Sequence, residues 1–203
     1  MVSRSVLCSI GAAGFSGVVA LAALTRMPWL QQYDDLVEAR AEPHRLRWRS
    51  IAGVATLTGE KFVHPVIAAI SALVLIHFRP GDPSHFLVPL GAASLGGITL
   101  HHLVKFIYHR HRPEGALRRN KTEAAYPSGH TTNATSVVAT SALLLVHEHL
   151  VAAGVAIPIL ILLCLATGFS RVMLGWHWAT DVLGGWMAGA GVASLAYALF
   201  LGM

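Results

Sequence analysis

The 203-residue chain is poor in charged side chains, which make up 12% of it, against roughly 25% in soluble domains. Hydrophobic residues make up 54%, and the mean hydropathy is +0.57. Apolar stretches of about 20 residues recur along the whole length without the polar alternation of a strand. The pattern therefore predicts an all-α, polytopic membrane protein and argues against a transmembrane barrel.

Cysteine is also scarce. The two cysteines, Cys8 and Cys164, both lie in apolar stretches, so a disulfide framework and a zinc knuckle are excluded. The chain has no internal repeat, no low-complexity tract and no linker-like boundary. We therefore expect a single integral-membrane domain over residues 1–203.

The apolar stretches predict a bundle of six transmembrane helices. The first is longer than the core of a signal peptide, about 7 to 15 residues, which favours a retained span over a cleaved signal. Connections between the spans alternate: the first, third and fifth are long or rich in charged residues, and the second and fourth are short. Odd-numbered connections share one side of the membrane, so any chemistry is expected there. The predicted spans are residues 5–25, 62–78, 86–108, 130–147, 151–170 and 179–201.

The first connection, residues 26–61, contains a segment with two alternative interpretations. Residues 30–42 form either an amphipathic helix at the membrane interface or a solvated connector. Pro28 is suited to begin a helix here and Pro43 to end one. The net charge of +5 comes from basic residues beside apolar spans, which indicates phosphate-bearing lipids rather than nucleic acid as partners.

Three ionisable residues follow the fifth predicted span, in the stretch SRVMLGWHWATD. If a helix begins near residue 176, His177 and Asp181 share one face, and the carboxylate can fix the tautomer of the imidazole. The other ring nitrogen then carries a lone pair suited to nucleophilic attack. Arg171 precedes them. Taken alone, His177 and Asp181 fit polar residues at a helix end slightly better than a catalytic pair.

Two further stretches carry polar residues on the same side. In YPSGH, Ser128 can cap a helix whose first amide groups bind anions, with Gly129 and His130 beside them. In KFIYHRHRP, Lys105 and Arg112 are suited to phosphate oxygens. An ordinary helix cap and a basic belt at the membrane surface are the simpler interpretations of each.

Together the three stretches predict a phosphate site. Lys105, Arg112 and Arg171 would surround a phosphoryl group, His177 would attack it, and His130 would protonate the leaving alkoxide. Such a site requires no metal and no cofactor, because the cations supply the positive charge.

The same stretches match the patterns KxxxxxxRP, PSGH and SRxxxxxHxxxD. In these residues the chain resembles the type-2 phosphatidic acid phosphatase superfamily, which also includes vanadium-dependent haloperoxidases. The resemblance implies that His177 is the nucleophile, His130 the general acid and Asp181 the orienting carboxylate. It assigns the phosphate to Lys105, Arg112, Ser128, Gly129 and Arg171, and implies a bilayer-embedded phosphatase acting on phosphatidate, phosphatidylglycerol phosphate or a polyprenyl diphosphate.

Two alternatives use the same residues. A lipid hydroxyl could attack the phosphohistidine in place of water, which would make the protein a phosphotransferase, or the pocket could serve lipid binding or transport without turnover. The resemblance places the site on the extracytoplasmic face of a plasma membrane. The positive-inside rule favours the opposite side, because 13 of the 15 Lys and Arg residues lie in or beside the first, third and fifth connections. The sequence leaves the oligomeric state open.

Several residues carry no assigned role. His101 and His102 lie within the third span, where packing is a simpler explanation than proton transfer. His147 and His149 are two residues apart and do not share a helix face, which argues against a metal pair. Gly185 and Gly189 form a GxxxG pattern, which serves either packing inside the bundle or dimerisation.

Overall fold

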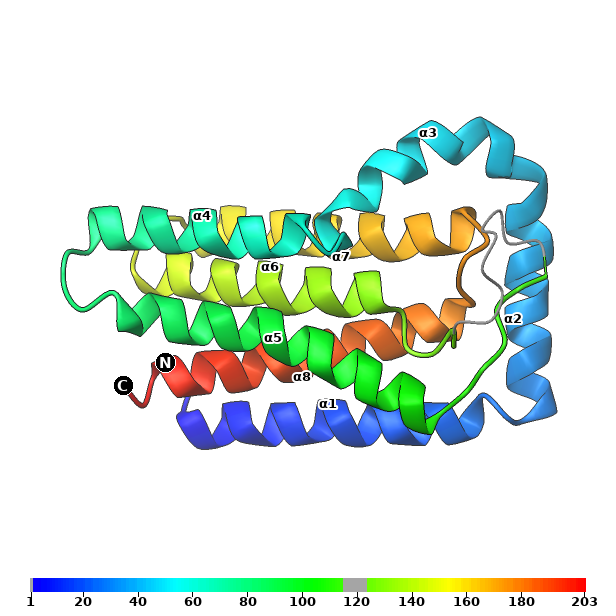
Figure 1. Ribbon diagram of the computed structural model, residues 1–203, viewed down its shortest axis with the longest axis horizontal. Helices are drawn as coiled ribbons and strands as arrows, with labels where there is room; N and C mark the ends of the chain where they lie inside the picture. The colour runs from blue at the N-terminus through cyan, green and yellow to red at the C-terminus, as the bar shows by residue number, and fades with distance from the viewer. Residues whose placement is uncertain (1, 115–123) are drawn as a thin grey trace.

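The computed structural model describes residues 2–114 and 124–203, and these residues form helices, turns and loops without a strand. The remainder of the predicted third connection, residues 115–123, lies outside the described residues. Six long helices run alongside one another (Figure 1), and their bounds lie within a few residues of the predicted spans. They are α1 (Arg4–Leu24), α4 (Val63–Phe78), α5 (Ser84–Ile107), α6 (Gly129–His147), α7 (Ala153–Met173) and α8 (Ala179–Phe200).

The predicted interfacial segment is helical. Between α1 and α4 the chain forms α2 (Pro28–Ala41), the 3-10 turn η1 (Glu42–His44), α3 (Arg45–Ala55) and the 3-10 turn η2 (Leu57–Gly59). Pro28 is the first residue of α2, as predicted, and Pro43 lies in the turn that follows it. Helix α2 crosses the end of the bundle that lies opposite the two termini (Figure 1). Its exposed side carries Trp29, Tyr33 and Leu36, as expected of a helix at a membrane interface.

Helices α6 and α8 form the centre of the bundle and approach each other closely. A Cβ on Gly185 would lie 2.9 Å from the carbonyl oxygen of Ser128, and one on Gly189 would lie 2.7 Å from that of Thr132. Only glycine allows the backbones to come this near. The GxxxG pattern therefore serves packing inside the bundle, one of the two uses predicted for it.

We expect replacement of Gly189 by leucine to separate α6 from α8 and to prevent folding, because the side chain has no space at this contact. Gly91 in α5 provides the matched control, since no atom lies within 4 Å of a Cβ placed there. The yield of monodisperse protein in detergent and its thermal midpoint measure the effect. Equal behaviour of Gly189→Leu and Gly91→Leu would contradict this packing argument.

Among the described residues, four helices are long and apolar enough to cross a membrane, namely α1, α5, α7 and α8. Helix α4 has 16 residues, so it spans about 24 Å of a hydrocarbon core about 30 Å thick. Helix α6 is rich in buried serine and threonine, and several of its hydroxyls bond to the backbone one turn earlier, as Thr140 Oγ1 does to the carbonyl of Ser136 at 2.8 Å. Its low hydropathy thus reflects a position surrounded by other helices.

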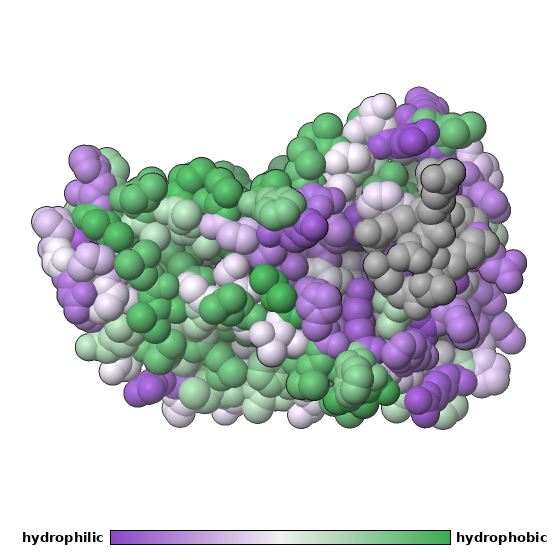
Figure 2. All heavy atoms as spheres, in the orientation of Figure 1, coloured by the Kyte–Doolittle hydropathy of each residue, from purple (hydrophilic) through white to green (hydrophobic). Residues whose placement is uncertain are grey.

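The hydropathy of the bundle surface changes along its long axis. A hydrophobic belt lies between two hydrophilic ends on the face shown in Figure 2. Beside the start of α4 and the C-terminal half of α5, hydrophilic residues extend into this belt. This is the end of the bundle that α2 crosses, and it is where the three predicted stretches meet.

Candidate active site

The three polar stretches converge at one end of the bundle, although up to 76 residues separate them along the sequence. Lys105 lies in the last turn of α5 and Arg112 in the segment after it. Ser128 precedes α6, while Arg171 lies in the last turn of α7. His177 lies in the loop between α7 and α8, and Asp181 in the first turn of α8.

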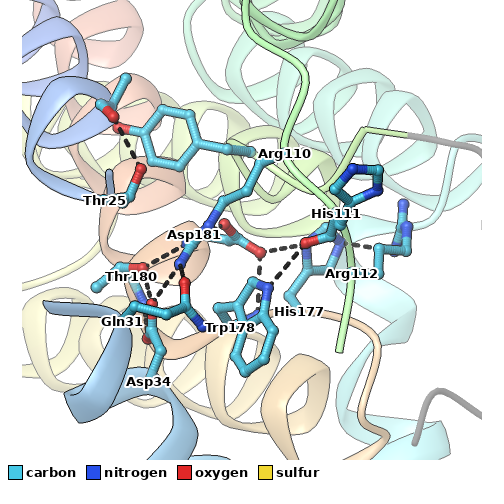
Figure 3. A network of polar contacts seen from close by, with 12 residues as sticks. Thr25, Gln31, Asp34, Arg110, His111, Arg112, His177, Trp178, Thr180 and Asp181 are labelled. Atoms are coloured by element: carbon cyan, nitrogen blue, oxygen red, sulfur yellow. Dashed lines mark hydrogen bonds and ion pairs between the residues drawn. The ribbon is translucent and has the colours of Figure 1, made fainter. Parts of the chain in front are cut away.

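The imidazole of His177 lies between a carboxylate and a guanidinium, with 2% of its side chain exposed (Figure 3). Its Nδ1 is 3.4 Å from Oδ2 of Asp181, and its Nε2 is 3.3 Å from Nη1 of Arg112. Because a carboxylate only accepts hydrogen bonds, Nδ1 carries the hydrogen and Nε2 carries the lone pair. This is the tautomer that a nucleophilic Nε2 requires.

The cations close to His177 are held in place by their own contacts. Nη1 of Arg112 donates to the carbonyl of Trp176 at 2.7 Å. Arg171 is fully buried, its guanidinium lies 4.2 Å from the centre of the Trp176 ring, and its Nη1 donates to Oγ1 of Thr56 at 2.7 Å. Lys105 is half-buried. Burial first, and then the charges of Arg171, Arg112 and Lys105, lower the pKa of His177 well below its ordinary value.

We expect His177 of the free enzyme to stay neutral as the pH falls through 6.5, because the lowered pKa favours the unprotonated ring. It should take up a proton only at a lower pH. Titration of the ¹⁵N-labelled histidine signals in detergent micelles measures this, and the variant His177→Asn identifies the signal. A protonation midpoint at or above 6.5 would contradict the proposed electrostatics of the site.

The start of α6 brings Ser128, Gly129 and His130 to the same place. Ser128 occupies the N-cap position, but the expectation that its side chain caps the helix is wrong. Its Oγ accepts a hydrogen bond from Oγ1 of Thr131 at 2.9 Å, while its backbone N–H donates to the carbonyl of Asp181 at 3.0 Å. The second bond ties the start of α6 directly to the start of α8.

Two histidines without an assigned role take part in packing. Nδ1 of His101 bonds to the carbonyl of Gly97 at 2.8 Å, and its ring is so close to Gly129 that a Cβ there would lie 2.9 Å from Nε2. At the other end of the bundle, Nδ1 of His147 bonds to the hydroxyl of Tyr197 at 2.8 Å. Among the described residues, no group of three or more His, Cys, Asp or Glu is placed to hold a metal ion.

One side of the site comes from a segment that the motifs do not include, residues 56–60. Besides Thr56, which accepts from Arg171, this segment provides Glu60, whose Oε1 lies 3.0 Å from Nε2 of His130. Gly59 packs so tightly that a Cβ there would collide with the backbone of His130. The only sequence signal was a carboxylate in a turn before an apolar helix, which is too common to be specific.

A buried ionic network behind Asp181 was also missed. Nη1 of Arg110 donates to Oδ1 of Asp181 at 2.8 Å, and its Nη2 donates to Oδ2 of Asp34 in α2 at 2.7 Å (Figure 3). Arg110 lies within the stretch KFIYHRHRP but outside the matched pattern, and Asp34 is one of several acidic residues of α2. Only the fold reveals that they belong to the site.

An apolar groove of about 810 Å³ opens between α2, α3, α7 and α8. Met173 and Ala179 on its wall flank the loop that carries His177, so the groove reaches the site end of the bundle. Aromatic side chains line much of it, including Trp48, Phe169 and Trp186.

Comparison with known proteins agrees with this arrangement. Phosphatidylglycerophosphatase B of Bacillus subtilis (strain 168) is 30% identical over 181 residues, which cover 83% of this chain and 84% of that protein. Undecaprenyl-diphosphatase BcrC of the same organism is 31% identical over 99 residues, 46% of this chain and 47% of that protein. The crystal structure of the first transmembrane PAP2 type phosphatidylglycerolphosphate phosphatase from Bacillus subtilis has a TM-score of 0.78 at 26% identity, covering 95% of this chain and 96% of that one.

All three are named as phosphatases, and the one with a solved structure is named as a transmembrane protein. The two that cover most of this chain match its apolar helices as well as its polar stretches. The chain is accordingly a multi-pass membrane protein and a phosphoric ester hydrolase. The model of the PAP2 superfamily matches residues 86–202, which contain all three stretches. The chain therefore belongs to the PAP2 superfamily, in agreement with the resemblance noted in its sequence.

Proposed function

We propose that this protein hydrolyses the phosphate monoester of a glycerophospholipid, first of all phosphatidylglycerophosphate, through a phosphohistidine at His177 and without a metal ion. The observation that carries the proposal is the position of His177, with Nδ1 facing Asp181 and Nε2 facing Arg112 at 3.3 Å. An imidazole held in this way presents a lone pair to a phosphate bound by the guanidinium.

The reaction has two steps. The Nε2 lone pair attacks phosphorus, the bond from phosphorus to the lipid oxygen breaks, and His130 gives its proton to the departing alkoxide. Water then attacks the phosphohistidine with His130 as the base, the bond from phosphorus to Nε2 breaks, and inorganic phosphate leaves. Asp181 stabilises the positive charge that the imidazole carries between the two steps.

Lys105, Arg112 and Arg171 stabilise the negative charge of the transferring phosphoryl group, as metal ions do in other phosphotransfer enzymes. The start of α6 adds the Ser128 hydroxyl and the Gly129 backbone as donors, because the first amide groups of a helix attract anions. Since these groups are covalently part of the chain, we expect full activity in EDTA.

The choice of phosphatidylglycerophosphate rests on the relatives that cover most of the chain, both of which carry that activity in their names. The polyprenyl diphosphatase matches less than half of it. The groove beside the site offers space for an acyl or prenyl tail, so it does not distinguish these substrates. Release of phosphate from purified protein, compared across phosphatidylglycerophosphate, phosphatidate and undecaprenyl diphosphate, decides among them, and a preference for the diphosphate would overturn our choice.

The same assay separates the alternative functions. Phosphate recovered as inorganic phosphate in the presence of EDTA supports a phosphatase. Phosphate recovered on a second lipid would indicate a phosphotransferase, and the absence of turnover with retained lipid binding would indicate a binding or transport protein. Loss of all activity on chelation would contradict the metal-free mechanism.

We further propose that residues 1–203 form one domain with six spans and that the site faces the extracytoplasmic side. The two termini lie together at the end of the bundle opposite the site (Figure 1). With six crossings both termini are on one side of the membrane, so an extracytoplasmic site goes with cytoplasmic termini. The distribution of Lys and Arg argues for the reverse orientation. Reporter fusions after Met203 and within residues 114–125 test this, and a cytoplasmic 114–125 loop would overturn it.

A further inference from the structure

We infer that Asp34 of α2 is a positioning residue of the active site, which acts through Arg110 and Thr180 on the carboxylate of Asp181. The inference rests on the proposed function, since it takes His177 as the nucleophile and Asp181 as the group that orients it. It assigns α2, which the sequence leaves as either an interfacial helix or a solvated connector, to the catalytic unit.

Asp34 lies on the buried face of α2, in line with Leu30 and Ala41, and 1% of its surface is exposed. Its Oδ1 accepts the backbone N–H of Thr180 at 3.0 Å, and its Oδ2 accepts the Thr180 hydroxyl and Nη2 of Arg110, the latter at 2.7 Å. A backbone amide in the first turn of α8 is therefore satisfied by a carboxylate from α2, 146 residues away in the sequence.

Arg110 connects this carboxylate to Asp181. Its Nη1 donates to Oδ1 of Asp181 at 2.8 Å and to Oγ1 of Thr180 at 2.7 Å, while its Nη2 holds Asp34 (Figure 3). Oδ2 of Asp181 is left to accept the backbone N–H of Trp178 at 2.9 Å and to face Nδ1 of His177. Each oxygen of the orienting carboxylate thus has a separate partner.

The charges of this network depend on one another. Arg110 lies between two carboxylates that are both almost fully buried, and burial of an ion is tolerated only when it is paired. If Asp34 loses its charge, the guanidinium has one carboxylate left, and it should shift toward Asp181. That shift draws Asp181 away from His177, although neither residue has been changed.

The neighbouring Asp35 provides a matched control, because it lies on the same helix but is exposed and does not bond to Arg110 itself. Its Oδ1 accepts from Nε2 of Gln31 at 2.9 Å, and Oε1 of Gln31 accepts from Nη2 of Arg110 at 3.1 Å. An asparagine oxygen at position 35 can keep the bond to Gln31, so Asp35→Asn removes a charge without releasing Gln31. We expect Asp34→Asn to lower kcat for lipid phosphate hydrolysis about 10-fold to 100-fold with KM changed less than about threefold, a typical cost for residues that hold a reactive group from behind. Asp35→Asn should match the wild type. Equal kcat values for the two variants would overturn the inference.

A double-mutant cycle separates positioning from a general loss of structure. If Asp34 acts through Asp181, Asp34→Asn should change kcat less than about twofold in the Asp181→Asn background. The same loss in both backgrounds would show that Asp34 acts elsewhere, and would contradict the inference.

A third readout needs no substrate. The NMR signal of the His177 Nδ1 proton, which reports its bond to Asp181, should shift in Asp34→Asn and stay in place in Asp35→Asn. An unchanged signal in Asp34→Asn overturns the inference whatever the activity. If the wild-type protein hydrolyses no lipid phosphate, the proposed function fails, and this comparison still tests the link from α2 to His177.

Discussion

Replacement of His177 by alanine should lower kcat for lipid phosphate hydrolysis by about 10⁵-fold to 10⁶-fold, the loss typical of an enzyme deprived of its nucleophile. The effect should be this large because, in our account, no other group forms the covalent intermediate. Release of inorganic phosphate at saturating substrate measures it. His77, which is exposed in the last turn of α4, provides the control, and His77→Ala should keep the wild-type rate.

Because the phosphate is held by other residues, the His177→Ala variant should still bind vesicles that contain phosphatidylglycerophosphate. Turnover at a tenth of the wild-type rate or more would exclude His177 as the nucleophile. Such a result would instead favour direct attack by water on a phosphate held by the cations.

Replacement of Arg171 should cause the second-largest loss. We expect Arg171→Ala to lower kcat/KM by about 10³-fold to 10⁵-fold, the range found for arginines that stabilise phosphoryl transfer. Arg171→Lys should still lose about 10²-fold, because lysine keeps the charge but neither the planar fork nor the contact with the ring of Trp176. Steady-state kinetics on the folded variants measures both.

Arg79 is the control for these substitutions, since it pairs with Glu148 on the exposed far end of the bundle. Arg79→Ala should therefore leave kcat/KM unchanged. A wild-type rate for Arg171→Lys would show that only the positive charge matters at this position. Our account of the pocket, in which the geometry of the guanidinium contributes, would then be wrong.

The parts of the site that follow from the sequence are those fixed by local spacing. The expected pairing of residues 177 and 181 is present, but α8 begins at Ala179 rather than near residue 176, so His177 reaches Asp181 from the loop just before the helix. The start of α6 follows from a turn sequence before a long helix. The six long helices follow from apolar runs. Helix α2 was one of two alternatives that the sequence left open, and the structure contains the helix, with Pro28 as its first residue.

The parts that do not follow depend on contacts between distant segments. Asp34 and Glu60 resemble any acidic residue of a polar connection, and only the folding of that connection over the end of the bundle brings them to Arg110 and His130. The capping role expected of Ser128 failed for a similar reason. Its hydroxyl is engaged by Thr131 and its amide by α8, a neighbour that lies more than 50 residues later in the sequence.

Among the long helices, too, some are recognised from their own sequence and one depends on its neighbours in the fold. Among the described residues, α1, α5, α7 and α8 are each long and apolar enough by themselves to cross a membrane. Helix α6 has a lower hydropathy, because a helix enclosed by other helices can carry hydroxyl groups that bond to its own backbone. The central position of α6 is therefore a consequence of packing that hydropathy does not report.

The covalent intermediate is the most direct test of the mechanism. Purified protein is mixed with phosphatidylglycerophosphate labelled with ³²P in its terminal phosphate, quenched in alkali within milliseconds, and digested for mass spectrometry. We predict that the label is acid-labile and resides on Nε2 of His177, and that it is absent from His177→Ala. Label on any other residue, or full turnover without labelled protein at any quench time, would contradict the account.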